Sequence, residues 1–303
     1  MHSHAFLTWP DTSSACYAAQ FIWAAFFRGG KRCAAADTSM STLRIFTVII
    51  ALLIAAGCAS GPSSPPYPAF VVSDELPDMF MASLPGIRAK QFNGNAETRA
   101  TSSRIDLPAD WSGTTGASPG KALEVFVLDG ELRLADMTLR RGGYAFLPPG
   151  SLGFNLHTDN GARILYFLDD LAGNAMIRTP MILDSGLVEW QATDTIGVLS
   201  KDLRVDPGSG ARTWLLRIEP GAQLPWQSTS VVREGYLVAG QFQDSECVDG
   251  EPYTEIYTAG GYFNRPADVV SGGPAASALT ESVWLLRESS SSVINADVVC
   301  APN

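Results

Sequence analysis

The chain reads Glu124-Val-Phe-Val-Leu-Asp-Gly130 and then Gly142-Gly-Tyr-Ala-Phe-Leu-Pro148-Pro-Gly150, and it repeats this pattern as Glu234-Gly-Tyr-Leu-Val-Ala-Gly240 and Gly260-Gly-Tyr-Phe-Asn-Arg-Pro266. The two glutamates are 110 residues apart, whereas Pro148 and Pro266 are 118 apart, so the second copy holds eight extra residues. We place the insertion at 244–252, an acidic, turn-rich stretch that we expect to be a surface loop. An internal repeat of this length sets the fold of the chain.

Short apolar or alternating runs separated by Gly, Pro, Asn and Asp predict β-strands. The runs are 124–128, 131–134, 144–147, 163–167, 213–218, 236–238 and 283–287. Only residues 74–83 suggest a helical period, and we expect one short helix there. Many short strands between turns indicate an all-β sandwich or barrel fold.

The repeated pattern resembles the paired motifs of the cupin family, present twice in one chain. The resemblance covers about residues 87–290 and is closest to two-cupin (bicupin) proteins of the RmlC-like, ChrR-like kind, here in bacterial lipoprotein form. It implies two tandem double-stranded β-helix (jelly-roll) barrels, at 87–185 and 186–297, followed by a tail at 298–303.

Cupins usually hold a metal ion through two histidines and a glutamate of the first motif and a third histidine of the second. Glu124 and Glu234 match that glutamate, but 117–121 and 226–230, where the histidine pair should lie, contain no histidine. Gly153 and Ser271 stand at the third histidine position. One carboxylate per barrel is too few ligands to hold a transition metal, so we expect no metal and no cofactor.

His157 is the only histidine after the expected signal sequence. It is a weak catalytic candidate, as a general base or a lone ligand, and so are Glu124 and Glu234. The alternative for His157 is a local hydrogen bond without any function. We see neither a Ser-His-Asp set nor a Gly-x-Ser-x-Gly motif, which makes a hydrolase triad improbable.

The candidate ligand-binding residues follow from strand alternation, which places every second side chain on one face. By the resemblance this face points into the barrels. The set is Glu124, Phe126, Glu234, Tyr236, Trp226, Tyr262 and Asn264. Aromatic rings with a carboxylate suit a small organic ligand, although each ring is individually more typical of core packing.

A buried carboxylate without a metal needs a partner, because an isolated buried charge is costly. Arg104 and Arg217 occupy matching strand positions and are our candidate partners. Each glutamate is then either a salt-bridged relic or a ligand anchor, and the sequence leaves both readings open.

The segment before the barrels indicates export and lipid anchoring. Residues 40–57 contain Arg44, an apolar run at 45–56 and Gly57, and Cys58 follows directly. This arrangement is typical of a signal peptide and resembles the lipoprotein cleavage box, with Cys58 lipidated. The alternative is an ordinary secretion signal with a chance cysteine. The Pro/Ser-rich stretch after Cys58 predicts a linker, within 58–86.

Residues 1–39 precede a second plausible start, and we expect them to be a mis-annotated extension; a genuine extended N-terminus is the alternative. Because Ala59 rather than Asp follows Cys58, the resemblance to lipoprotein sorting favours the periplasmic face of the outer membrane. In that oxidising compartment, Cys247 and Cys300 are expected to form a disulfide.

The formal net charge of −10 argues against a nucleic-acid partner, because phosphate binding needs a basic surface. We therefore expect a membrane-anchored, metal-free module of the cell envelope, either ligand-binding or structural, as a monomer or small homo-oligomer. Two alternatives remain: a cupin-type enzyme, metal-independent or with a divergent metal site, acting on a small organic substrate, and an envelope interaction protein. A carboxylate of raised pKa beside an open polar cavity would favour the enzyme.

Overall fold

The computed structural model describes residues 67, 70–81, 84–95, 97–114, 120–151 and 153–301. These residues form strands, turns and two short 3-10 helices, η1 (Ser73–Glu75) and η2 (Ser185–Leu187). None of the helices described is long and apolar enough to cross a membrane. The expected N-terminal extension, the signal peptide and Cys58 lie outside the described residues. The all-β fold class is confirmed.

The first barrel is built on a sheet with the strand order β11-β8-β6-β10-β4-β3-β2. The long strand β6 also pairs with β7 and β9, and β9 pairs with β5, which closes the barrel. The bounds are β2 (Asp78–Phe80), β3 (Arg88–Gly94), β4 (Thr101–Leu107), β5 (Trp111–Thr114), β6 (Lys121–Leu134), β7 (Met137–Arg140), β8 (Gly143–Leu147), β9 (Asn155–Thr158), β10 (Ala162–Asp170) and β11 (Met181–Asp184).

The second barrel is built on a seven-stranded sheet with the order β1-β19-β16-β21-β14-β13-β12. A three-stranded sheet (β18-β17-β20) and the pair β15-β22 complete it. The bounds are β1 (Val71–Val72), β12 (Gln191–Ala192), β13 (Val198–Val205), β14 (Arg212–Ile218), β15 (Ser228–Thr229), β16 (Arg233–Ala239), β17 (Gln241–Val248), β18 (Glu251–Thr258), β19 (Gly261–Arg265), β20 (Ser277–Ala278), β21 (Ser282–Glu288) and β22 (Ile294–Asn295).

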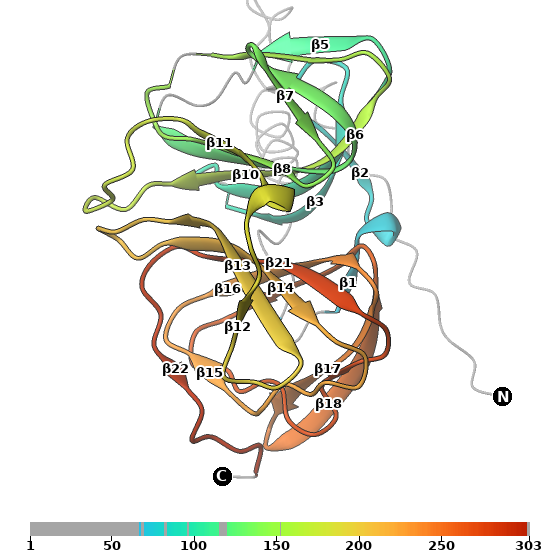
Figure 1. Ribbon diagram of the computed structural model, residues 1–303, viewed down its shortest axis with the longest axis vertical. Coiled ribbons are helices and arrows are strands. Elements are labelled where there is room, and N and C mark those ends of the chain that lie inside the picture. Colours follow the sequence, from blue (N-terminus) through green and yellow to red (C-terminus); the bar gives the residue numbers. More distant parts are fainter. Residues whose placement is uncertain are drawn as a thin grey trace, which may run out of the picture. The chain divides into compact units, whose positions relative to one another are not determined.

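The two barrels stack on each other through their large sheets (Figure 1). One apolar cluster fills the first barrel, around Leu123 and Ile164, and another fills the second, around Trp284 and Phe242. A third cluster lies between the barrels and takes side chains from both, including Phe126 and Tyr236. Burying apolar area on both faces of each large sheet stabilises the stack as one unit.

Gly130 and Gly240, which end the first half of each copy of the repeat, are required by the backbone geometry. Gly130 and Gly240 have φ of 77° and 93°, in the left-handed region where other residues are strained. A side-chain carbon would lie 2.3 Å from the Gly161 carbonyl oxygen at the first position and 2.2 Å from that of Glu281 at the second. The repeated Gly therefore marks equivalent tight backbone crossings in the two barrels.

Two local predictions were wrong. The helix expected at 74–83 is limited to the single turn η1, because Pro77 disfavours helix in the residue before it and β2 pairs with β3. The insertion expected as a loop is the hairpin β17–β18. Its turn places Asp249 and Gly250 at positive φ, as the hairpin turn with the favoured twist requires.

Part of the range predicted as linker belongs to the folded body. The strand β1 pairs with β19 of the second barrel, and the Ser73 amide donates to the Gly260 carbonyl oxygen at 3.0 Å. The next strand, β2, pairs with β3 of the first barrel. The chain therefore completes the edge of the second barrel before it builds the first.

Candidate functional site

Alternation along β6 and β16 decides which residues face the barrel interiors. Leu123 and Val125 belong to the apolar cluster inside the first barrel, and Leu237 belongs to the one inside the second. The intervening positions, including Phe126 and Tyr236, belong to the cluster between the barrels. Glu124 and Glu234 share that outward face with them.

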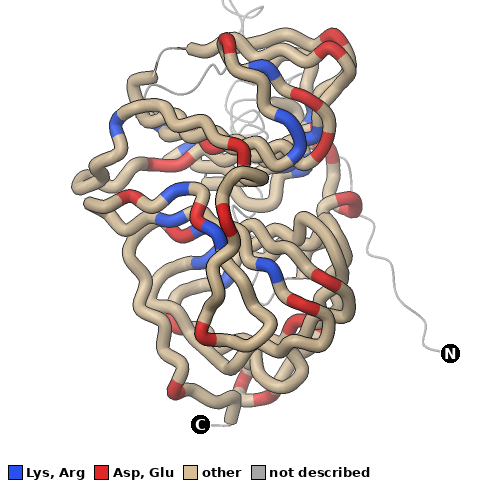
Figure 2. The backbone as a smooth tube through the Cα atoms, in the orientation of Figure 1, with Lys and Arg blue, Asp and Glu red and all other residues tan. Residues whose placement is uncertain are grey.

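The prediction that these glutamates point into the barrels is therefore wrong. Side chains alternate with period two along a strand, so an offset of one residue in matching a motif reverses the face. The residues that face inward beside them are Leu123 and Arg233. Both glutamates instead meet at the junction of the two barrels, where acidic and basic residues lie side by side (Figure 2).

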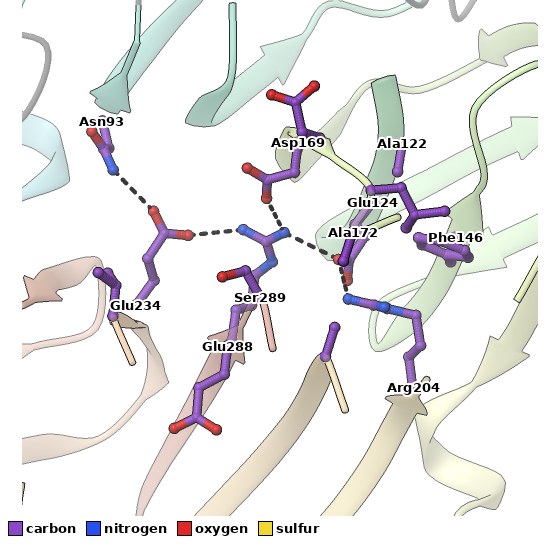
Figure 3. A pocket seen from close by; sticks show the side chains of 15 residues that line it. Asn93, Ala122, Glu124, Phe146, Asp169, Ala172, Arg204, Glu234, Glu288 and Ser289 are labelled. Carbon is purple, nitrogen blue, oxygen red and sulfur yellow. Dashed lines mark hydrogen bonds and ion pairs between the residues drawn. The ribbon is translucent and has the colours of Figure 1, made fainter. Parts of the chain in front are cut away.

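Arg287 of β21 joins three carboxylates there (Figure 3). Its Nη1 donates to Glu234 Oε2 at 2.8 Å, and its Nη2 donates to Asp169 Oδ2 at 2.5 Å and to Glu124 Oε1 at 3.1 Å. The Arg287 side chain is only 9% exposed. One guanidinium thus ties two carboxylates of the first barrel to one of the second.

Glu124 is satisfied by further donors from both barrels. Arg204 Nη2 donates to its Oε1 at 2.9 Å, while Tyr144 and Thr213 each donate to its Oε2 at 2.6 Å. Burial opposes the charged form of Glu124, but Arg204, Arg287 and the two hydroxyls outweigh it and lower its pKa to about 2.

Glu234 has its own donors besides Arg287. Ser102 Oγ and Tyr262 Oη donate to its Oε1 at 2.8 and 2.9 Å, and Asn93 Nδ2 does so at 3.3 Å. Ser102 and Asn93 come from the first barrel, so this glutamate also bridges the two halves.

The partners expected from the sequence were wrong. Arg104 pairs with Asp74 at 2.6 Å and with Asp106 at 3.4 Å. Arg217 lies over the ring of Trp190, 4.9 Å from its centroid. Glu234 pairs with Arg287 of its own barrel, on the neighbouring strand β21, and Glu124 pairs with Arg204 and Arg287 of the other barrel.

The low pKa of Glu124 predicts a pH dependence of stability. Its pKa is about 2 in the folded protein and near 4.5 when unfolded, so its contribution is full above pH 4.5 and is lost as pH falls toward 2. We expect about 3 kcal/mol of unfolding free energy to disappear over this window. Urea unfolding of the protein and of Glu124→Gln at several pH values checks this: the difference between them should shrink on acidification, and a constant difference would contradict it.

A cavity of about 160 Å³ opens beside this cluster, with room for about five water molecules. The first barrel contributes strand residues and the end of β10, and the second contributes β13, β16 and β21. Its walls are Asn93, Ala122, Glu124, Phe146, Asp169, Asp170, Leu171, Ala172, Arg204, Ala211, Val232, Glu234, Arg287, Glu288 and Ser289.

Asp169 is the carboxylate of the cluster that the cavity leaves most open, with 40% of its side chain exposed against 4% for Glu124. The surrounding protein and the nearby carboxylates of Glu234 and Glu124 raise the pKa of Asp169, and Arg287 only partly opposes this. The cavity therefore holds two carboxylates whose surroundings move their pKa values in opposite directions. Such a pair is a common basis for acid–base chemistry.

Of the seven residues predicted to bind a ligand, Glu124 and Glu234 line the cavity. Phe126, Tyr236 and Tyr262 pack in the core between the barrels and are not among the cavity walls, although Tyr262 donates to Glu234. Trp226 lies against Gly273 in the second barrel, and Asn264 pairs with Glu234 across the strands β16 and β19. Neither of the last two lines the cavity.

The interior of the second barrel does not fit the metal that the cupin resemblance implies. Arg265 donates to both oxygens of Glu246 and, at 3.0 Å, to Asp244, while Arg233 pairs with Glu288 at 2.8 Å. A guanidinium therefore already occupies these carboxylates.

The space left in that barrel is about 40 Å³, enough for about one water molecule, with Ser271 in its wall. In the first barrel the inward positions are apolar, and Gly153 is exposed. Within the part of the chain that the structure describes, no three His, Cys, Asp or Glu side chains gather as a metal site would require.

His157 lies on β9, away from the cavity. Its Nδ1 is 2.7 Å from Ser112 Oγ and its Nε2 is 2.7 Å from Asp159, so a Ser-His-Asp chain exists that sequence inspection did not find. Asp159 also pairs with Arg133 at 2.7 Å, and the group is largely exposed. An exposed chain of this kind, in which Arg133 competes for the carboxylate, is typical of a surface hydrogen-bond network.

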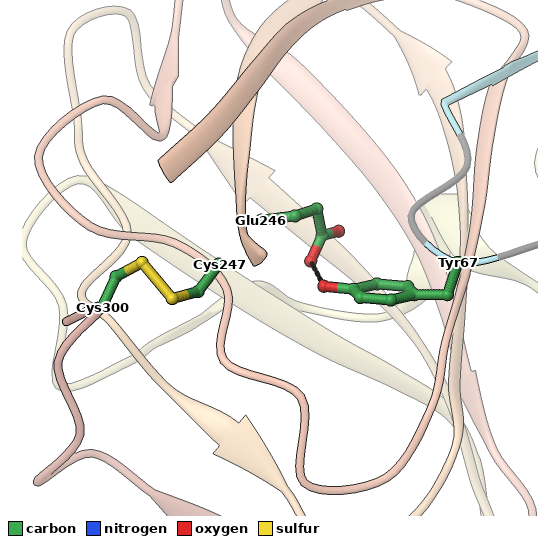
Figure 4. The surroundings of a disulfide bond; sticks show 4 residues. All are labelled: Tyr67, Glu246, Cys247 and Cys300. Carbon is green, nitrogen blue, oxygen red and sulfur yellow. Dashed lines mark hydrogen bonds between the residues drawn. A yellow bond between two sulfur atoms is a disulfide. The ribbon is translucent and has the colours of Figure 1, made fainter. Parts of the chain in front are cut away.

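The disulfide joins Cys247 to Cys300, with their Cα atoms 5.4 Å apart (Figure 4). Cys247 lies on β17 rather than in a loop, next to Glu246. Tyr67 donates its hydroxyl to Glu246 Oε2 at 2.8 Å. Tyr67, which precedes the first strand, and Cys300, which follows the last strand, are thus both attached to β17 of the second barrel.

Sequence inspection missed Arg204, Arg287 and Asp169 as site residues. Arg287 ends a predicted strand and Asp169 closes β10, but no local pattern distinguishes either from a solvent-facing charge. The duplication was the one signal in the sequence that pointed to this site. It marks Glu124 and Glu234 as equivalent charges, and the structure shows that both pair with Arg287.

The architecture is a cupin-type fold with two tandem barrels. Solved structures share it: a candidate dioxygenase of Nostoc punctiforme (19% identity, 76% of this chain and 87% of that one, TM-score 0.60), the YlbA protein of E. coli (17%, 73% and 90%, 0.57) and a variant of Bacillus subtilis oxalate decarboxylase (11%, 89% and 89%, 0.56). Residues 85–293 match the family described as a domain of unknown function, DUF4437, and the chain belongs to that family. No curated protein matches.

Proposed function

We propose that this protein is a metal-independent module that binds a small organic molecule in the cavity between its two barrels, held at the cell envelope by a lipid on Cys58. The observation that carries the proposal is the composition of the cavity: Glu124, Glu234 and Asp169 converge on Arg287, and Asp169 keeps an exposed carboxylate. A concave site with a few convergent polar groups is the usual form of a small-molecule site.

The site uses both barrels, which explains why a duplicated chain would keep charged residues on faces that otherwise pack as a core. An ionic cluster in such a place is weak evidence for stability alone, because desolvation offsets much of its attraction. A ligand that contacts the cluster gives these charges a role. The envelope location and a monomer or small homo-oligomer remain parts of the proposal.

The test is a screen of small organic molecules by thermal shift and ligand-observed NMR on the full chain in detergent. Ala172→Trp fills the cavity from its wall, and Ala296→Trp places the same side chain on an exposed position just after β22. We expect ligands to stabilise the protein and Ala296→Trp but not Ala172→Trp. Equal binding to both variants would place the site elsewhere and reject the proposal.

Metal independence is tested separately by elemental mass spectrometry. The full chain is stripped with chelator and re-exposed to Fe, Mn, Zn, Ni and Cu. We expect no stoichiometric metal, because the carboxylates inside the second barrel are held by arginines. About one metal per chain would overturn this part of the proposal.

A second candidate function, a metal-independent enzyme, is favoured by the raised pKa of Asp169 beside an open cavity. Asp169 would then hold and donate a proton, and Glu124 would remain charged. The two candidates differ in whether a bound compound changes. If the protein converts the compound and Asp169→Asn, supplied with enough compound to saturate it, does not, the protein is an enzyme; a compound that binds and stays unchanged supports the binding module.

A further inference from the structure

The cavity between the barrels exposes carboxylates and hides its arginines. The side chains of Asp169 and Asp170 are 40% and 59% exposed, whereas those of Arg204 and Arg287 are 5% and 9% exposed. A ligand entering the cavity therefore meets negative oxygens first.

The charges that line the cavity do not balance. Besides Glu288, which pairs with Arg233, four carboxylates stand in its walls: Glu124, Asp169, Asp170 and Glu234. The three cations paired with them are Arg204, Arg287 and Lys121. One negative charge is left without a cation, in a place where the surrounding protein screens it less than bulk water would.

Asp169 is the carboxylate on which this uncompensated charge is most accessible. Arg287 holds its Oδ2, whereas its Oδ1 accepts no hydrogen bond from any residue that the structure describes. A carboxylate oxygen open to a cavity is a good acceptor for an ammonium group, and such charge-assisted hydrogen bonds are the strong ones.

A second feature concerns Arg204, which also lines the cavity. Its Nη2 donates to Glu124 at 2.9 Å, and its guanidinium lies over the ring of Phe146, 4.6 Å from the centroid. Its Nε and Nη1 are buried away from the cavity. Arg204 is therefore already engaged by the protein, and the exposed oxygen of Asp169 is the group that a ligand meets.

We infer that the cavity between the barrels binds a small aliphatic amine, with its ammonium group at Asp169. This inference rests on the proposed function and names its ligand class. The cavity of about 160 Å³ limits the ligand to a compact molecule.

A matched series of four-carbon compounds tests the ligand class by calorimetry or NMR titration. The probes are 4-aminobutan-1-ol, butylamine, butane-1,4-diol and succinate. We expect 4-aminobutan-1-ol and butylamine to bind, and the diol and the diacid not to bind measurably. Binding of succinate or the diol as tight as that of the amines would overturn the inference.

Two variants test whether the ammonium group of the ligand binds at Asp169. Asp169→Asn keeps the size of the side chain and should weaken binding of 4-aminobutan-1-ol by at least about tenfold, the value of one hydrogen bond to a charged group. Asp129→Asn is the matched control on an exposed position of β6 and should leave binding unchanged. Equal losses in both variants, or none in Asp169→Asn, would contradict the assignment.

The outcomes separate this inference from the proposed function. If none of the four probes binds but the wider screen finds a ligand that Ala172→Trp excludes, the amine is wrong and the binding module stands. If no compound of any class depends on Ala172, both are wrong.

Discussion

Replacing Arg287 with methionine is expected to lower the free energy of unfolding by about 3–5 kcal/mol, because three carboxylates would lose their common cation inside the protein. Methionine fills a similar space, so the loss reports charge rather than a cavity. Urea unfolding at pH 7 measures it. The penalty should become smaller at lower pH, since protonation of the stranded carboxylates removes their repulsion.

The control is Arg140→Met. Arg140 pairs with Glu131 at 3.1 Å, but its side chain is 76% exposed, and exposed pairs contribute at most about 1 kcal/mol. If Arg287→Met cost no more than this control, the cluster would not hold the barrels together. If its penalty were the same at pH 5 and pH 7, the stranded carboxylates would not be its cause.

Loss of the disulfide is the second large expected effect. Cys247 and Cys300 are 53 residues apart, and the entropy of closing such a loop corresponds to about 4 kcal/mol of unfolding free energy. We expect Cys247→Ser/Cys300→Ser to lose up to this amount, measured by thermal or urea unfolding under oxidising conditions. The C-terminal segment that begins at β22 should detach first, because β22 pairs only with the two-residue strand β15.

The single variants Cys247→Ser and Cys300→Ser give the control. Either one breaks the bond, so each should be as unstable as the double variant, and a reducing agent should bring the unsubstituted protein to the same value. Additive losses from the two single variants would mean that the cysteine side chains contribute by packing instead of by bonding.

The fold was readable because its signals are local and repeated. Alternating strands, the tight Gly130 and Gly240, and the spacing between the two copies all follow from backbone geometry. The short helix at 74–83 failed because its signal was weak and pairing of β2 with β3 overrides local propensity. The hairpin β17–β18 was missed because acidic, turn-rich composition describes its turn and hides its strands.

The site was only half readable. Glu124 and Glu234 stood out as the repeated charges in apolar strands, and both line the cavity. The predicted direction of their side chains, into the barrels, was wrong because shifting a strand by one residue moves every side chain to the opposite face of the sheet. Arg287 meets Glu234 as its cross-strand neighbour in the second barrel, but it meets Glu124 and Asp169 through packing of one barrel on the other, between segments more than a hundred residues apart. Sequence periodicity within a barrel carries no information about that packing.

The order in which the strands are made has a consequence for how this protein reaches its native state. Val71 and Val72 leave the ribosome long before Tyr262 and Gly261, with which they pair. The strand β1 therefore stays without its partner until β19 has been made, whereas N-terminal units normally fold first during synthesis. Unpaired strands invite pairing with other chains. The first strand of the body thus waits for one of the late strands, and a chain cut short before β19 would leave it without a partner.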